Sequence, residues 1–119
     1  MRCYVGVPEG AGPFPAVVVI QHAGGVDEFT RTMSDRFASA GYLAVSPELY
    51  HRETEEESGN DPLTRMGGLR DANIVVDVNA AIDHASGLPE VVSDRVGITG
   101  FCMGGRVCWL MAATNPIFK

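Results

Sequence analysis

The stretch "VGITGFCMGGR", Val96–Arg106, decides how this sequence folds. It begins as an apolar run and then places Cys102 between Gly100 and Gly104. The apolar segment "VCWLMAA" of residues 107–113 follows almost at once. With 14 glycines among 119 residues, such a string is weak evidence by itself. Its meaning depends on whether a strand precedes it and a helix follows it.

The strands expected upstream are short and apolar. Residues 16–21, "AVVVIQ", and residues 42–47, "YLAVSP", lack the polar alternation of a half-exposed strand, so we expect both to be buried on two faces. Residues 3–8 and 94–99 are also predicted as strands. The turn around Cys102 therefore follows the fourth strand.

Helical periodicity separates these strands. Phe29, Met33 and Phe37 are spaced as one face of a helix, with Asp27 as its N-cap and Gly41 at its C-terminal end. A second helix begins near residue 69, and a third follows the turn and ends before residue 116. The second helix presents one apolar face, formed by Ile74, Val78, Ile82 and Ala85.

The order of these elements predicts an α/β fold. Strands that alternate with helices and are uniformly apolar indicate a mostly parallel sheet with helices on both faces, and we expect residues 1–119 to form one domain. Residues 48–68 show no period and contain the acidic "ETEEESGNDP". We expect this segment to be a solvated surface loop, with a cation site as the alternative.

Charge and cysteine content narrow the class of protein. The net charge is −6, which disfavours nucleic acid and anionic membranes as partners because both require clustered Lys and Arg. The first residues lack the apolar segment of a signal peptide, and no apolar run approaches transmembrane length. Cys3, Cys102 and Cys108 form a sparse, odd set that favours free thiols and a cytoplasmic location. No zinc-ligand spacing is present, and we expect neither metal nor cofactor.

The glycine-cysteine turn suits a nucleophile elbow. A cysteine between a strand end and a helix start stands above the sheet, where the helix N-terminus favours the thiolate. The backbone N–H of Met103 would face a developing oxyanion, and a second donor is expected from the loop "HAGG" after strand 16–21. Small residues at Gly100, Gly104 and Gly105 would relieve crowding around this turn.

Two segments resemble the dienelactone hydrolases of the α/β-hydrolase superfamily. They are "PAVVVIQHAGGVDEFTRTMSDRFASAGYLAVSPELYHR", Pro15–Arg52, and "DRVGITGFCMGGRVCWLMAA", Asp94–Ala113. The resemblance implies that Cys102 is the nucleophile and that the N–H groups of Met103 and Ala23 are the oxyanion donors. It implies hydrolysis of an ester or lactone, with small cyclic enol-lactones as the substrate class, through an acyl-cysteine intermediate.

The sequence departs from that family in two ways. Many members carry a glutamate where this chain has His22, and their triad continues with an Asp and a His beyond the position of Lys119. We therefore expect an N-terminal portion of the fold that stops after the nucleophile helix and is inactive alone. We also expect strand 95–100 to keep an open edge through which the chain self-associates.

Other polar residues have simpler interpretations. His22 should border Cys102 without an orienting third group, whereas His51 and His84 are expected on the surface. Cys108 is expected in the core. Two arginines, Arg65 and Arg70, are expected on the surface, with carboxylate binding as their alternative.

Two other functions stay open at this point. "TGFCMGGR" partly fits the phosphate loop of nicotinamide-dependent short-chain dehydrogenases, although Arg106 replaces its final glycine. A non-catalytic, thiol-bearing fragment is the second alternative. A bound nicotinamide would favour the first, and an unreactive thiol would favour the second.

Overall fold

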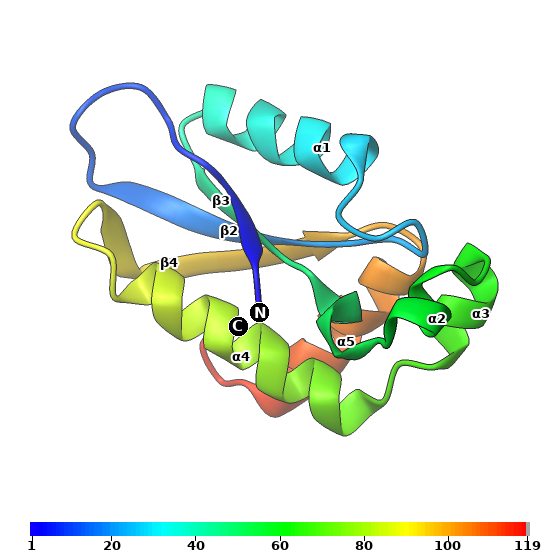
Figure 1. Ribbon diagram of the computed structural model, residues 1–119. Helices are drawn as coiled ribbons and strands as arrows, with labels where there is room; N and C mark the ends of the chain where they lie inside the picture. Colours follow the sequence, from blue (N-terminus) through cyan, green and yellow to red (C-terminus); the bar gives the residue numbers. More distant parts are fainter. Residues whose placement is uncertain (119) are drawn as a thin grey trace.

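A four-stranded sheet with the strand order β1-β3-β2-β4 organises the computed structural model, which describes residues 1–118 (Figure 1). β2 pairs in parallel with both β3 and β4, and β1 pairs antiparallel with β3. The sheet is therefore mostly parallel, as predicted. The strands are β1 (Cys3–Gly6), β2 (Phe14–Ile20), β3 (Leu43–Pro47) and β4 (Val91–Gly100).

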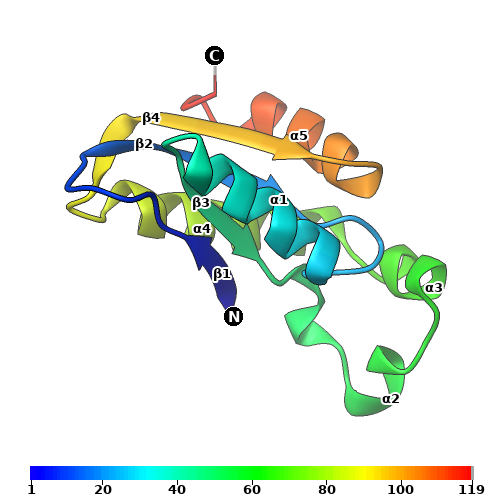
Figure 2. The same ribbon diagram turned by 90° about the horizontal axis from the view of Figure 1, so that it is seen from above.

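Helices cover both faces of this sheet. α1 (Glu28–Ser39) lies on one face, while α4 (Asp71–Ser86) and α5 (Met103–Thr114) lie on the other (Figures 1 and 2). Asp27 caps α1 as predicted, since its side chain accepts a hydrogen bond from the Thr30 N–H. α1 lies between β2 and β3 in the chain, and α4 lies between β3 and β4, so these two helices belong to the crossover connections that parallel strands require.

The core has two parts, one on each face of β2. The larger part joins alternate residues of β2 and β3 to the apolar faces of α4 and α5. The smaller part places Val17, Val19 and Ala44 against α1. Because alternate residues of β2 point to opposite faces and residues 16–20 are all buried, its unbroken apolar run was the correct signal for a central strand. The predicted face of α4 is buried as well, at Ile74, Val78, Ile82 and Ala85.

The predicted inner face of α1 is confirmed at Met33 and Phe37, which pack against the core, and is wrong at Phe29. Phe29 is 44% exposed, whereas Thr30 and Ser34 are buried. A Cβ added at Gly6 would lie 3.0 Å from the Ser34 carbonyl oxygen, so α1 approaches β1 very closely. The hydroxyls of Ser34 and Ser46 are 2.6 Å apart between α1 and β3. Small residues are therefore needed where α1 meets β1 and β3.

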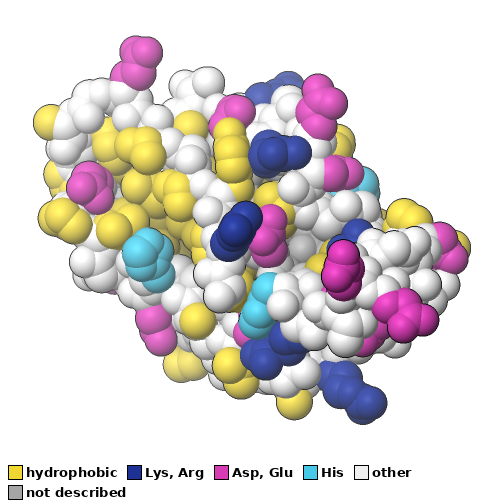
Figure 3. Space-filling view, in the orientation of Figure 1, with side chains coloured by type: hydrophobic (Ala, Val, Ile, Leu, Met, Phe, Trp, Pro, Cys, Tyr) yellow, Lys and Arg dark blue, Asp and Glu magenta, His cyan; other side chains and the backbone are white. Residues whose placement is uncertain are grey.

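Residues 48–68 are not a plain loop. They form η1 (Leu49–Arg52), α2 (Glu55–Ser58) and α3 (Pro62–Gly67). Thr54 caps α2 and Asp61 caps α3 through their side chains. These local capping signals were present in "TEEE" and "DPLT" but each helix is shorter than the window in which periodicity is visible. Most of the acidic residues of this segment face solvent, namely Glu55, Glu56, Glu57 and Asp61, and acidic side chains are visible on the surface in Figure 3.

β1 forms one edge of the sheet and β4 forms the other, so within residues 1–118 β4 has no partner strand on its outer side. An open groove of about 940 Å³ follows this edge and is lined by β4 together with Cys108 and Trp109 of α5. Trp109 is 82% exposed, and Cys108 is only half-buried, so the prediction of a core position for Cys108 is wrong. None of the helices formed by residues 1–118 has the length and apolar character needed to cross a membrane.

Candidate active site at the end of the fourth strand

Cys102 occupies a strained turn between β4 and α5. Its φ is +56° and its ψ is −117°, and among residues 1–118 no other residue except glycine has a positive φ. Backbone strain of this kind costs about 1–3 kcal/mol and persists only where its surroundings enforce it. The residue is exposed at the N-terminus of α5. This is the backbone geometry predicted for a nucleophile elbow.

The glycines around Cys102 differ in how much space they have. A Cβ on Gly100 would lie 2.5 Å from the carbonyl carbon of Gly104, so the turn and the helix touch directly. A Cβ on Gly104 would lie 2.7 Å from the Ile20 carbonyl oxygen at the end of β2. A Cβ on Gly105 meets nothing closer than 3.6 Å, which is ordinary contact. The elbow therefore requires glycine at 100 and 104, and the predicted need at Gly105 is wrong.

The loop after β2 lies beside this turn, since Ile20 is paired with Gly100 in the sheet. The Gly25 N–H donates to the His22 carbonyl oxygen at 3.0 Å, and the Tyr50 hydroxyl donates to the Ala23 carbonyl oxygen at 2.7 Å. Among residues 1–118, no hydrogen bond is found that uses the N–H of Ala23 or Met103 as donor. The N–H groups of Ala23 and Met103 therefore have no hydrogen-bond acceptor among the described residues, and both follow the carboxyl ends of the neighbouring strands β2 and β4.

His22 has an orienting partner, contrary to the sequence-based expectation. Its Nε2 lies 2.9 Å from Oδ2 of Asp27, the residue that also caps α1. The imidazole packs against Phe29 with the ring centroids 5.1 Å apart, and Phe29 packs against Phe101 at 5.4 Å. These aromatic contacts connect His22 to the residue preceding Cys102. No hydrogen bond between His22 and Cys102 is found in the part of the chain described.

Asp27 is held as a carboxylate. Partial burial would by itself raise its pKa, but hydrogen bonds from Thr30 and His22 lower it below the ordinary value. The sequence identified Asp27 only as a helix cap. Its second contact could not be inferred because it depends on how the loop between β2 and α1 closes.

Two residues predicted at the surface, His51 and Arg65, pair with carboxylates of the protein, and His51 is exposed as expected. His51 and Arg52 both contact Asp77 of α4, a side chain that is only 7% exposed. Arg65 donates three hydrogen bonds to Glu53, which leaves its guanidinium committed within the protein. His84 and Arg70 are exposed as expected. The carboxylate-binding alternative is therefore weakest at Arg65.

Metal binding gains no support from the described residues. Within residues 1–118, no three His, Cys, Asp or Glu side chains gather in a way that could hold a metal ion. The acidic segment 48–68 is included in this statement. Among the described residues, therefore, no cluster of potential ligands supports a cation site in segment 48–68.

The fold and the turn together define an α/β-hydrolase arrangement, in which a strained residue joins the end of a parallel strand to a helix. The sequence model of the Dienelactone hydrolase family matches residues 1–119. The chain belongs to this family. The alternative of a nicotinamide-binding phosphate loop loses its basis. The glycines that suggested it, Gly100 and Gly104, are packed against the backbone of the protein itself.

Named relatives agree with this assignment. A "Putative carboxymethylenebutenolidase" of Methylorubrum extorquens is 38% identical over 98% of this chain and 41% of its own length. A protein of the same name from Escherichia coli K12 is 42% identical over 91% of this chain and 41% of its own. A crystal structure titled as a "Putative Dienelactone Hydrolase" from Klebsiella pneumoniae superimposes with a TM-score of 0.86 at 38% identity, covering 97% of this chain and 50% of that one. The chain therefore spans about half the length of the relatives it matches.

Proposed function

We propose that Cys102 is the nucleophile of an ester or lactone hydrolase. The supporting observation is its backbone: a non-glycine residue with φ of +56° is exposed between the end of β4 and the start of α5. Strain at this position has a purpose if the side chain must be presented to a substrate. The family assignment supports hydrolysis as the reaction of the whole protein, and we propose small cyclic enol-lactones as its substrate class.

The proposed chemistry begins with the Cys102 thiolate. Sγ attacks the carbonyl carbon of the ester or lactone, and the carbonyl oxygen becomes an oxyanion that accepts hydrogen bonds from the N–H groups of Met103 and Ala23. The C–O bond to the leaving oxygen then breaks, which leaves a thioester on Cys102, and the leaving oxygen takes a proton from water. An ester releases its alcohol at this step, whereas the hydroxyl or enol of an opened lactone stays attached to the acyl group. Water then hydrolyses the thioester, which releases the acid and restores the Cys102 thiolate.

The base that assists these steps is not assigned to a described residue. His22 is paired with Asp27 and is proposed to border the site without completing it. The resemblance implies an Asp and a His from a segment that follows the one present here. We therefore propose that residues 1–119 alone are inactive or nearly so, with a non-catalytic role for the isolated chain as the second candidate.

We also propose a cellular location and an interaction behaviour for the protein. Three free cysteines support a cytoplasmic location. A net charge of −6 argues against nucleic acid as a partner. The unpaired edge of β4 and the exposed Trp109 support self-association through that edge.

The deciding experiment compares two thiols in the same chain. Burial raises the pKa of the Cys108 thiol, which lowers the fraction present as thiolate at neutral pH. We expect iodoacetamide to label the exposed Cys102 at least about tenfold faster than Cys108, as read by peptide mass spectrometry. Cys102→Ala should abolish acylation by an activated ester, while Cys108→Ala should leave it intact. Equal labelling of the two cysteines in the folded chain would contradict the nucleophile assignment.

A further inference from the structure

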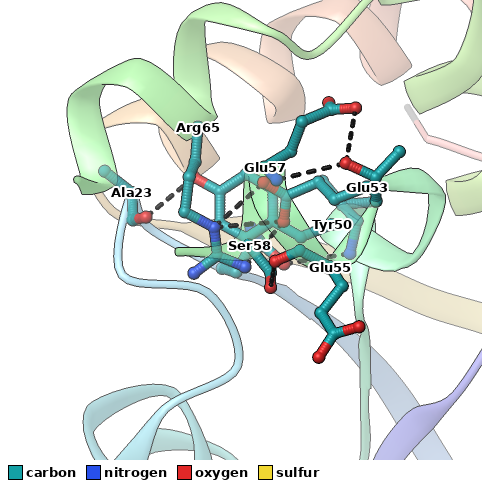
Figure 4. Close-up of polar contacts among 10 residues, drawn as sticks. Ala23, Tyr50, Glu53, Glu55, Glu57, Ser58 and Arg65 are labelled. Carbon is teal, nitrogen blue, oxygen red and sulfur yellow. Dashed lines mark hydrogen bonds and ion pairs between the residues drawn. The ribbon is translucent and has the colours of Figure 1, made fainter. Parts of the chain in front are cut away.

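The Tyr50 side chain connects two segments that are distant in the sequence. It belongs to η1, after β3, and its hydroxyl donates to the carbonyl oxygen of Ala23 in the loop after β2 (Figure 4). The donor–acceptor distance is 2.7 Å, which is the ordinary length of a hydrogen bond from a hydroxyl donor. A Cβ added at Gly25 would lie 3.4 Å from the Tyr50 ring, so the ring packs directly against the same loop.

The ring itself is held in place. The Arg65 guanidinium lies 4.2 Å from the centroid of the Tyr50 ring, and Arg65 is in turn bound to Glu53 (Figure 4). The Arg65 side chain is 23% exposed and that of Glu53 is 12% exposed, so the pair is largely withdrawn from solvent. Stacking and ion pairing therefore restrict the ring far more than a surface tyrosine would be restricted.

A buried amide anchors the backbone next to Tyr50. Gln21, the residue after β2, is fully buried, and its Oε1 accepts a hydrogen bond from the Leu49 N–H at 2.9 Å. This contact holds the start of η1 against the end of β2. Burial raises the pKa of Tyr50, with smaller effects of Arg65 lowering it and Glu53 raising it, so the hydroxyl keeps the proton that it donates.

The hydrogen bonds of this loop act on two consecutive peptide planes. The Gly25 N–H binds the His22 carbonyl oxygen and so orients the peptide that carries the Ala23 N–H. Tyr50 binds the Ala23 carbonyl oxygen and orients the next peptide. In a trans peptide the N–H points away from the carbonyl oxygen of the same plane. With both planes restrained, the direction of the Ala23 N–H is set.

We infer that Tyr50, braced by Arg65 and Glu53, is a positioning residue that holds the Ala23 N–H in place as an oxyanion donor. This role rests on the proposed function, because an oxyanion forms only if Cys102 attacks a carbonyl group. Tyr50 does not touch the reacting atoms. It acts through the loop, and its loss should slow acylation without altering the reactivity of the thiol itself.

Tyr50→Phe removes the hydroxyl and keeps the ring over which Arg65 stacks. Its matched control is Tyr4→Phe, which removes a hydrogen bond of the same 2.7 Å length, from Tyr4 to Asp35, on the far edge of the sheet. The acylation rate of Cys102 by p-nitrophenyl acetate in a single turnover is compared with its alkylation rate by iodoacetamide. Removal of an oxyanion donor costs about 100- to 1,000-fold, so a misplaced one should cost about tenfold.

Three results support the inference together. Tyr50→Phe acylates about tenfold more slowly, its alkylation rate changes less than about twofold, and hydrogen exchange accelerates in the peptide covering residues 21–27. Tyr4→Phe leaves all three values unchanged. Slow alkylation of Cys108 and an unchanged far-ultraviolet circular dichroism spectrum verify that Tyr50→Phe is folded. If it is not, Arg65→Gln, which frees the ring but retains the hydroxyl, is measured in its place under the same criteria.

The experiment distinguishes failure of the nucleophile role of Cys102 from failure of the positioning role of Tyr50. Acylation of wild type no faster than that of Cys102→Ala would overturn the nucleophile role and, with it, the positioning role. Acylation of wild type with an equally fast Tyr50→Phe would overturn only the role of Tyr50. Slowed acylation with unchanged exchange in residues 21–27 would also overturn it, because the effect would not have passed through the loop.

Discussion

Replacing Gly104 with alanine tests whether the turn at Cys102 is as tightly packed as the structure indicates. The added methyl group would lie 2.7 Å from the Ile20 carbonyl oxygen and 2.9 Å from that of Gln21, well inside the 3.4 Å at which ordinary contact begins. Both oxygens belong to the backbone where β2 ends, so neither can rotate aside. The N-terminus of α5 must move away from the sheet, which would also release the strained backbone of Cys102.

The free energy of unfolding should fall in this variant and not in its neighbour. Alanine is favoured over glycine inside a helix by up to about 1 kcal/mol, whereas overpacking costs about 1–3 kcal/mol or more. Because the overlap is with two backbone atoms, we expect a net loss of about 2 kcal/mol for Gly104→Ala. Gly105→Ala meets its nearest atom at 3.6 Å, so it should be neutral or more stable by up to about 1 kcal/mol.

Urea unfolding followed by circular dichroism measures this difference. A separation of about 2 to 3 kcal/mol between the two variants corresponds to about 1 to 1.5 M in the urea midpoint, for a slope near 2 kcal/mol per M. Iodoacetamide labelling of Cys102 should also slow in Gly104→Ala and stay unchanged in Gly105→Ala. Equal midpoints for the two alanine variants would refute the reasoning, because the carbonyl groups of Ile20 and Gln21 would then not confine the turn.

Three further outcomes are expected. Residues 1–119 should show little or no steady-state turnover of an activated ester, since no hydrogen bond joins His22 to Cys102 within the described chain; sustained turnover that His22→Ala abolishes would instead make His22 a working base. Because the pKa of Asp27 is lowered on folding, its contribution to stability is present above its unfolded value of about 4 and is lost as the pH falls through the lower folded value. Hydrogen exchange in the first turn of α1 should accelerate on acidification from pH 6 to pH 3 in wild type, and less so in Asp27→Asn; an identical pH response in the two would count against the cap. Light scattering on the isolated chain should report species larger than a monomer, because β4 has an open edge beside the exposed Trp109; a monodisperse monomer that melts cooperatively would contradict this.

Much of the fold could be read from the sequence, because its signals are local. The unbroken apolar run of β2 and the buried face of α4 each require only a count of residues along one element. Cys102 was recognisable for the same reason: a sharp turn between a strand and a helix needs glycine within two residues on either side. Asp27 was likewise found as a cap from its position alone.

Tertiary structure decided what depends on the distance between segments. Gly104 and Gly105 are equivalent in the sequence, yet only Gly104 faces the end of β2, so only it must lack a side chain. Arg65 and His51 lie in an acidic, aperiodic stretch that predicts exposure, and His51 is exposed. Their carboxylate partners, Glu53 and Asp77, could not be predicted, because they depend on how α3 and η1 fold back. Tyr50 belongs to no motif that the sequence analysis identified. Its contact with Ala23 exists because η1 and the loop after β2 meet beyond the carboxyl ends of β3 and β2. Composition and periodicity determine which elements form, since both act along the chain, while the partner of each polar side chain is set only when those elements pack.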